Sequence, residues 1–346
     1  MTLSDGATQG RHAWIEPGVF EVAPGVHRIP LPLPSDGLRA VNVYAIEDGG
    51  QLVLIDSGWA LEEARDQLET ALGKLGYGFE NVRRFLVTHV HRDHYTLGVT
   101  LRRTFGTSVS LGIGEQPSLE NILAGRADGQ ASELRRWGAG ELAALVESAR
   151  DGDDKPPDHY EMPDDWIEGT AEIELTTRTL RAVPTPGHTR GHVVFVDANS
   201  SLLFSGDHVL PHITPSIGLE PARAELPLGD YLDSLRLMHS YPDMHLLPAH
   251  GPIADSVHTR VDELLAHHDE RLKQTEQAIR NGAGTAHEAA LKLGWTRHNR
   301  HLEEMDEFNR VLAIGETAAH LDVLVARGSL RSSTVDGVVE YRTVAT

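Results

Sequence analysis

The sequence predicts an α/β fold with a smaller, mainly helical module at its C-terminal side. Two changes of pattern along the chain carry this prediction. Runs rich in β-formers alternate with amphipathic helical runs up to about residue 112, and β-rich runs return between residues 171 and 252. After about residue 258 the pattern becomes helical. Because alternating strands and helices are typical of α/β layers, we expect one domain at residues 1–258 and a module at residues 259–346.

The first strands are predicted at residues 25–33, 40–46 and 51–56, and the stretch "EDGG" separates the last two. Asp-Gly-Gly between two β-rich runs is a hairpin signal. Residues 56–76 then read as a turn and a helix, because their apolar residues recur at the i, i+3, i+4 spacing of one helix face. These apolar residues are Leu61, Ala64, Leu68, Ala71, Leu72 and Leu75.

The next elements continue the alternation. A buried strand is predicted at residues 83–89, a helix at 96–106 and a further strand at 108–112. Residues from about 115 to 170 are helical or loop-like and rich in charge, which indicates an insertion. The returning β-rich runs then cover residues 171–209, where "DANS" predicts a turn, and residues 245–252.

The predicted helices of the C-terminal module are residues 260–282, 285–295 and 307–328. The first helix ends at Asn281-Gly282, a common C-terminal stop. The remaining residues read as a hairpin that turns at Asp336-Gly337. Three helices followed by a hairpin resemble a winged-helix module.

Composition narrows the classes of function. A net charge of −20 argues against a phosphate-binding surface, and residues 259–346 hold 11 Lys and Arg against 14 Asp and Glu, so nucleic acid is an improbable partner. Cys is absent, which excludes disulfides, thiolate ligands and a Cys nucleophile. We find no signal-peptide pattern and no run near the ~18 apolar residues of a membrane span. A soluble, cytoplasmic protein is therefore expected.

The stretch "HVHRDH" at residues 89–94 concentrates candidate metal ligands at the end of a buried strand. Residues two apart on a strand face the same side, so His89 and His91 can point at one centre. Asp93 and His94 follow where the chain turns into a helix and can point at a neighbouring centre. Because a divalent metal takes about four to six ligands, further ligands must come from elsewhere.

Three later candidates also stand at strand ends: His188 in "PTPGHTRGH", Asp207 in "FSGDHV" and His250 in "LLPAHGP". Together with the four residues of "HVHRDH" they give seven ligands. Seven ligands suit two metals that share one carboxylate.

The stretches "THVHRDH", "PGHTRGH", "SGDH" and "PAHG" occur in the order and approximate spacing found in the metallo-β-lactamase superfamily, which residues 18–258 therefore resemble. The resemblance implies a four-layer αββα sandwich with a dinuclear zinc site along one edge. It implies that one metal is held by His89, His91 and His188. It implies that the other is held by Asp93, His94 and His250, that Asp207 bridges both, and that Asp56 supports the metal loop.

Asp207 also separates the branches of this family. The antibiotic-hydrolysing enzymes of the best-known class have a Cys at this position. A bridging Asp instead resembles glyoxalase II, acyl-homoserine lactonases, phosphodiesterases and the β-lactamase-like nucleases. Zinc suits the His-rich ligand set, with iron or manganese as alternatives.

After the HxHxDH pattern the family often has a pair of glycines, whereas this chain has Tyr95, Thr96 and Leu97 before Gly98. The departure leaves two interpretations of Tyr95. It could pack in the core, or its phenol could hydrogen-bond a developing oxyanion as a catalytic residue.

We expect a hydrolase in which two metals lower the pKa of a bridging water, and the resulting hydroxide attacks a thioester, a lactone or a related ester. Asp93 and Asp207 neutralise metal charge, and Asp93 also orients the hydroxide. The first alternative, suggested by the C-terminal module, is a phosphodiesterase or endoribonuclease. The second is a non-catalytic sensor that binds a ligand. We expect the module to dock on the sandwich and to help form a homodimer.

The insertion and two further histidines complete the candidate residues. The insertion has an apolar face that includes Trp137, and we interpret this face as a small packed core, as the underside of a lid over the metals, or as both, because a lid needs packing too. His192 and His208 follow ligand motifs closely and could contact the ligands.

Overall fold

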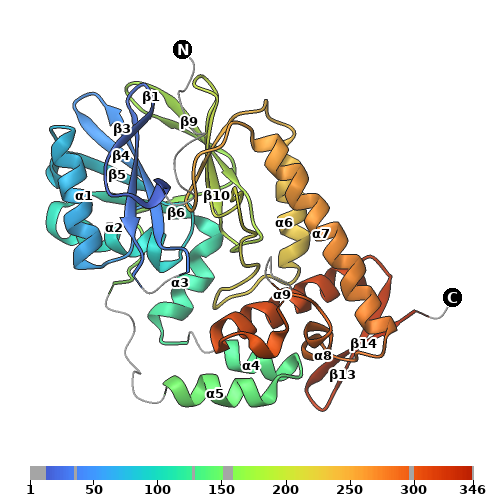
Figure 1. Cartoon of the computed structure of the whole chain (residues 1–346). Coiled ribbons are helices and arrows are strands. Elements are labelled where there is room, and N and C mark those ends of the chain that lie inside the picture. Colours follow the sequence, from blue (N-terminus) through green and yellow to red (C-terminus); the bar gives the residue numbers. More distant parts are fainter. Residues whose placement is uncertain (1–12, 35–36, 127–128, 151–158, 296–299, 345–346) are drawn as a thin grey trace.

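The computed structural model describes residues 13–34, 37–126, 129–150, 159–295 and 300–344. The prediction that there is no signal peptide concerns residues 1–12, which lie outside the described residues. Residues 151–158 of the predicted insertion also lie outside them. The described residues form three β-sheets, and the two larger ones pack face to face with helices on both outer faces (Figure 1).

Seven strands make the first sheet, in the order β1-β2-β3-β4-β5-β6-β7. They are β1 (Phe20–Ala23), β2 (Val26–Pro32), β3 (Ala40–Asp48), β4 (Gln51–Ile55), β5 (Val82–Leu86), β6 (Ser108–Gly112) and β7 (Asp165–Ile167). Neighbours are antiparallel from β1 to β4 and parallel from β4 to β7. Gly49 and Gly50 join β3 to β4 with left-handed φ angles of 60° and 85°, so the hairpin predicted from "EDGG" is confirmed.

Five strands make the second sheet, in the order β12-β11-β10-β9-β8. They are β8 (Ala171–Glu174), β9 (Thr179–Pro184), β10 (Val193–Asp197), β11 (Leu202–Gly206) and β12 (His245–Pro248). The pairs from β8 to β11 are antiparallel, and β11 pairs with β12 in parallel. The predicted turn "DANS" is confirmed, since it joins the antiparallel neighbours β10 and β11.

Helices cover both sheets and complete four layers. The helices are α1 (Glu62–Lys74) and α2 (Arg92–Phe105) on the first sheet, and α6 (Pro227–Met238) and α7 (Val257–Arg280) on the second. Between the sheets lies an apolar core in which Tyr44 meets Phe204 edge to face, with ring centroids 5.3 Å apart. The αββα sandwich implied by the resemblance is therefore confirmed.

The C-terminal region continues from α7 into α8 (Ala286–Leu291), α9 (Glu307–Ala326) and the hairpin of β13 (Leu330–Val335) and β14 (Val338–Thr343). The hairpin turns at Asp336 and Gly337, both with positive φ, as predicted. One apolar core runs from the second sheet through α6 into α7 and α9. Docking of the module on the sandwich is thus confirmed, whereas the boundary at residue 258 and the winged-helix resemblance stay predictions.

The insertion between β6 and β7 contains α3 (Gln116–Leu123), α4 (Gly129–Arg136) and α5 (Gly140–Arg150). Its apolar residues divide between two cores. Leu119 of α3 joins the core of the first sheet, whereas Leu134 of α4 and Trp137 join the core of the C-terminal helices. Figure 1 shows α4 and α5 beside α8 and α9.

The surroundings of Trp137 bear on whether the apolar face of the insertion is a packed core or the underside of a lid. Its side chain is buried among the C-terminal helices, and its ring lies so close to Gly315 of α9 that an added Cβ would come within 3.4 Å. Its carbonyl accepts a hydrogen bond of 3.0 Å from the amide of His287. Trp137 therefore packs in a core, and a lid over the metals stays a prediction.

Short 3₁₀ helices complete the secondary structure: Ala13–Ile15, Phe79–Asn81, Ile113–Glu115 and Leu302–Glu304. Among the described residues we find no helix with both the length and the apolar character needed to cross a membrane.

Candidate metal centre

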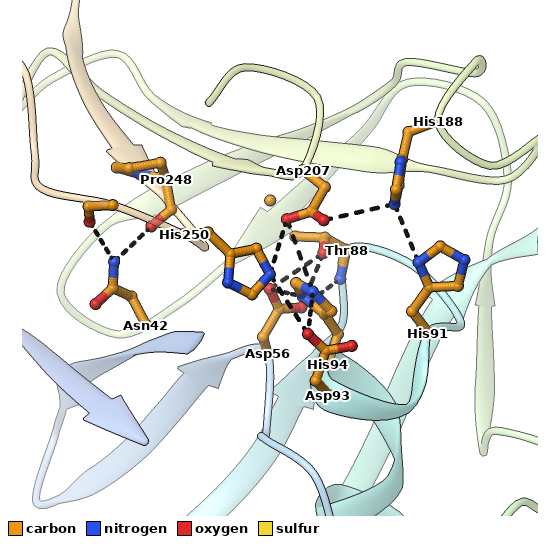
Figure 2. Close-up of polar contacts among 12 residues, drawn as sticks. Asn42, Asp56, Thr88, His91, Asp93, His94, His188, Asp207, Pro248 and His250 are labelled. Atoms are coloured by element: carbon orange, nitrogen blue, oxygen red, sulfur yellow. Dashed lines mark hydrogen bonds and ion pairs between the residues drawn. The ribbon is translucent and has the colours of Figure 1, made fainter. Parts of the chain in front are cut away.

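The seven predicted ligands come from four chain segments that follow strands or begin a helix. His89 and His91 follow β5, and Asp93 and His94 lie in the first turn of α2. The other three follow the strands of the second sheet, with His188 after β9, Asp207 after β11 and His250 after β12. Figure 2 shows six of these side chains turned toward one another, namely His91, Asp93, His94, His188, Asp207 and His250. The structure therefore brings all seven together.

Three imidazoles converge on one point. The Nε2 atom of His89 lies 3.0 Å from Nδ1 of His91 and 3.2 Å from Nε2 of His188, and the latter two atoms are 3.1 Å apart. We call His89, His91 and His188 the three-histidine group.

The opposite ring nitrogens show which atoms carry protons. Nδ1 of His188 lies 2.7 Å from the carbonyl oxygen of Ser216, and Nε2 of His91 lies 2.8 Å from that of Leu219. A carbonyl oxygen only accepts, so these two nitrogens donate, and the converging nitrogens of both neutral rings are lone pairs.

The proton of His89 can be placed in the same way, from its contact with Thr88. The Thr88 hydroxyl lies 2.9 Å from one carboxylate oxygen of Asp56 and donates to it. It must then accept from Nδ1 of His89 at 3.0 Å, which leaves a lone pair on Nε2 of His89. Three lone pairs at this spacing repel one another unless a cation lies between them, so the group fits a metal ion.

A second group lies beside the first. The Oδ2 atom of Asp93 is 3.5 Å from Nε2 of His94 and 3.4 Å from Nε2 of His250. The Nδ1 atoms of both rings donate elsewhere, to Asp56 at 2.9 Å and to the carbonyl of Ala40 at 2.8 Å. We call Asp93, His94 and His250 the carboxylate group.

Asp207 faces both groups (Figure 2). Its Oδ1 atom lies 3.7 Å from Nε2 of His94 and 3.4 Å from Nε2 of His250, and its Oδ2 atom lies 3.5 Å from Nε2 of His188. Oδ1 of Asp207 and the Nε2 atoms of His94 and His250 are buried without a hydrogen-bond partner. Buried polar atoms are normally satisfied, so this arrangement also fits a metal.

Asp56 fixes the carboxylate group from the turn after β4. It is buried with a φ of 60°, an unusual conformation for a residue other than glycine. One carboxylate oxygen accepts from the amide and hydroxyl of Thr88, and the other accepts from Nδ1 of His94. A single side chain thus orients His94 of the carboxylate group and Thr88, the partner of His89 in the three-histidine group.

Electrostatics differ between the two groups. Burial lowers the pKa of His188 to about 4. Burial and the neighbouring imidazoles hold the pKa of His89 well below its ordinary value. Burial also lowers the pKa of His94, but the carboxylates of Asp93, Asp56 and Asp207 outweigh it and raise that pKa to about 10. The metal-free carboxylate group therefore attracts positive charge.

Tyr95 has a different place from the one predicted for a catalytic residue. Its side chain is fully buried in the core of the first sheet, and its hydroxyl donates to the carbonyl of Glu161 at 2.7 Å. Because the phenol proton is engaged in this hydrogen bond, Tyr95 does not donate to an oxyanion in this structure. We assign Tyr95 to packing.

The two further histidines behave differently. His192 contacts the site, because its Nε2 atom accepts from the amide of Asp207 at 3.2 Å and its ring stacks 5.1 Å from that of His89. His208 points into the core, where its ring meets Tyr231.

The carbonyls of Ser216, Leu219 and Ala40, which accept hydrogen bonds from the candidate ligands, were not predicted, since backbone acceptors leave no mark in the sequence.

Residues 36–250 match the sequence model of the Metallo-beta-lactamase superfamily. The chain is 24% identical over 339 residues to "Probable metallo-hydrolase YqjP" of Bacillus subtilis (strain 168), and the match covers 92% of this chain and 97% of the relative. It is 26% identical over 302 residues to "Atrochrysone carboxyl ACP thioesterase AgnL7" of Paecilomyces divaricatus, covering 86% and 78%.

Two solved structures are similar over most of the chain. A metallo-beta-lactamase family protein from Thermus thermophilus has a TM-score of 0.78 and 28% identity, and the match covers 94% of this chain and 100% of that one. A beta-lactamase domain protein from Burkholderia ambifaria has a TM-score of 0.77 and 29% identity, with 94% of each chain covered. The family match spans more than half of the sequence and all seven converging residues, and the chain therefore belongs to the metallo-β-lactamase superfamily.

Proposed function

We propose that this metallo-β-lactamase superfamily hydrolase binds two divalent metal ions and cleaves a thioester, with lactones and related esters as neighbouring substrates. The observation that carries the proposal is the convergence of imidazole nitrogens and carboxylate oxygens on two adjacent points, with one oxygen of Asp207 facing each. Zinc is the metal we propose, because imidazole and carboxylate are its usual ligands in catalytic sites. Iron and manganese are the alternatives.

Such a metal pair, when bound, polarises a carbonyl and activates a water molecule. Asp93 is the side chain we assign to orienting that water. Burial raises the pKa of Asp93, but the histidines around it outweigh burial and hold the pKa well below its ordinary value, so the carboxylate accepts hydrogen bonds. Its side chain is also more exposed than that of Asp207, which gives water access to it.

The fate of the leaving group favours a thioester. An alkoxide leaving group needs a proton, and the Tyr95 hydroxyl is engaged with Glu161. A thiol with a pKa of about 8.5 leaves as a thiolate without a proton donor. A relative that aligns with most of this chain is named an ACP thioesterase, which supports the same substrate class.

Phosphodiester cleavage is the alternative, and the charge of the chain counts against a nucleic-acid substrate. A sensor without catalysis is a weaker alternative, because the ligand set is complete. The winged-helix character of the module, a homodimer and a cytoplasmic location stay predictions from the sequence.

A hydrolysis screen tests the proposal. Zinc-loaded protein is given an acyl thioester, an acyl-homoserine lactone, a phosphodiester and RNA, with metal-free protein and the Asp207→Asn variant as controls. We expect turnover of the thioester that both controls lose. Turnover of the phosphodiester or RNA with an inert thioester would replace the proposal by the alternative, and an inert panel would favour the sensor.

A further inference from the structure

The segment between Asp207 and α6 supports the three-histidine group. We call residues 216–223 the support loop. Its carbonyls at Ser216 and Leu219 accept hydrogen bonds from Nδ1 of His188 and Nε2 of His91, at 2.7 Å and 2.8 Å. Since these two bonds decide which nitrogen of each ring keeps its lone pair, the position of the loop determines the ligand geometry.

The support loop is attached closely to the His188 turn. The amide of Gly218 lies 3.1 Å from the carbonyl oxygens of both Gly187 and His188. Gly218 has a φ of 65°, and a Cβ there would meet Pro227 at 3.0 Å. A displacement of the loop would therefore displace His188 as well.

Glu220 ties the support loop to the insertion. Its two carboxylate oxygens accept from the amide of Arg190 and from the hydroxyl of Ser118 in α3, each at 2.8 Å. These bonds join the loop to residues on both sides of it, but neither reaches the C-terminal module.

Arg223 ties the support loop to the C-terminal module. Its Nη2 atom donates to Asp322 of α9 at 3.3 Å, and its guanidinium lies 5.5 Å from the ring centroid of Trp137. Asp322 is held in turn by the hydroxyl of Tyr341 at 3.1 Å. The side chain of Arg223 is only 15% exposed, so solvent and salt screen this pair less than an ordinary surface ion pair.

Helix α7 holds the same segment at its other end. Arg260 donates to the carbonyls of Leu210 at 2.6 Å and Ile213 at 3.0 Å. The C-terminal region thus holds the chain on both sides of Ser216, from α7 and from α9.

The carboxylate group is oriented from another part of the molecule. His94 is oriented by Asp56, and His250 is oriented by the carbonyl of Ala40. Both supports belong to the first sheet and its loops. Asp56 also holds Thr88, the partner of His89, so the support loop orients only His91 and His188 of the three-histidine group.

We propose that Arg223 is a positioning residue through which the C-terminal module sets the metal affinity of the three-histidine group and leaves that of the carboxylate group unchanged. This role gives the module a function in the metal site itself. It rests on the proposed metal pair, but it does not depend on the identity of the substrate.

The test is a zinc titration of the metal-free, full-length protein against a competing chelator, which yields two dissociation constants. Arg223→Met removes the guanidinium, and Asp322→Asn removes its partner's charge on α9. Arg280→Met is the matched control, since Arg280 is an exposed arginine of α7 that pairs within its own helix with Glu276. Circular dichroism and thermal melting establish that each variant is folded.

We expect Arg223→Met and Asp322→Asn each to raise one of the two dissociation constants roughly tenfold. This is the lower end of the loss of affinity that follows removal of a partner of a metal ligand. The other constant should stay unchanged, as should both constants of the control. Asp56→Asn, which disturbs His94, should weaken the other constant, so the double variant with Arg223→Met should weaken both.

Three results would overturn the proposal. They are unchanged constants in the folded variants, equal weakening of both constants, and weakening of the same constant that Asp56→Asn affects. If Arg223→Met does not fold, Asp322→Asn decides alone. Failure of the wild-type protein to bind two zinc ions is a separate result, because it removes the metal pair on which the proposed function rests.

Discussion

Replacing Asp56 by Asn would test how the carboxylate group is oriented. One oxygen of Asp56 accepts from the amide and hydroxyl of Thr88 at 2.8 Å and 2.9 Å, and the other accepts from Nδ1 of His94 at 2.9 Å. Asn keeps one oxygen, which the two donors of Thr88 retain. Its NH₂ group then faces Nδ1 of His94 and can only donate.

His94 must respond by moving its proton. Nδ1 becomes the acceptor and Nε2 carries the hydrogen, although Nε2 is the atom that faces Asp93 and Asp207. A protonated Nε2 cannot bind a metal. Backbone strain is not the cause, because Asn tolerates the left-handed conformation that Asp56 has at a φ of 60°.

Loss of such a partner typically reduces metal affinity about 10- to 100-fold, which corresponds to ~1.4–2.7 kcal/mol of binding free energy. We expect this loss at one of the two zinc constants. Asp197→Asn is the matched control, since Asp197 is also buried but pairs with Arg178 at 2.9 Å, away from the ligands. It should lower the melting temperature and leave both constants unchanged. Two unchanged zinc constants in folded Asp56→Asn protein would refute the tautomer reasoning.

Three further predictions follow from the same structure. Trp137→Ala should lower the free energy of unfolding by ~3–5 kcal/mol, because Trp137 is core, while two zinc ions still bind at saturation; an unchanged denaturant midpoint would contradict this. Burial lowers the pKa of His268 to about 2 and of His320 to about 3. Below pH ~6.5 these histidines therefore bind protons in the unfolded chain and stay neutral in the folded chain. The free energy of unfolding should fall by up to ~1.4 kcal/mol per pH unit for each histidine as the pH drops toward ~3. The double variant His268→Leu/His320→Leu should show a weaker dependence of the urea midpoint on pH than the wild-type protein. The same dependence in both proteins would contradict this role of the two histidines. Asp207→Ala should reduce metal content and turnover together, and normal values of both would remove Asp207 from the site.

The convergence of the seven candidate ligands could be predicted from the sequence because these residues are local and ordered. "HVHRDH" places four of them within one strand end and one helix turn, and the other three stand directly after apolar β-rich runs. β9, β11 and β12 run in the same direction, since β10 is antiparallel to both β9 and β11 and β12 is parallel to β11. Their carboxyl ends therefore lie at one edge of the sheet, which brings His188, Asp207 and His250 together.

Other features were not predicted, for physical reasons. Helix α6 was not assigned, although Pro227 at its first position and Leu228, Tyr231, Leu232 and Leu235 at helical spacing are a readable signal. The insertion was treated as one apolar face, whereas its residues divide between two cores, and periodicity does not tell which partner a face has. Tyr95 was ambiguous because a phenol serves packing and catalysis equally well.

The most direct test of the account is the anomalous diffraction of zinc-loaded crystals measured at the zinc edge. The account predicts two peaks in each chain, one among His89, His91 and His188 and one among Asp93, His94 and His250, with Asp207 between them. A single peak, or peaks elsewhere in a protein saturated with zinc, would contradict the two-metal site.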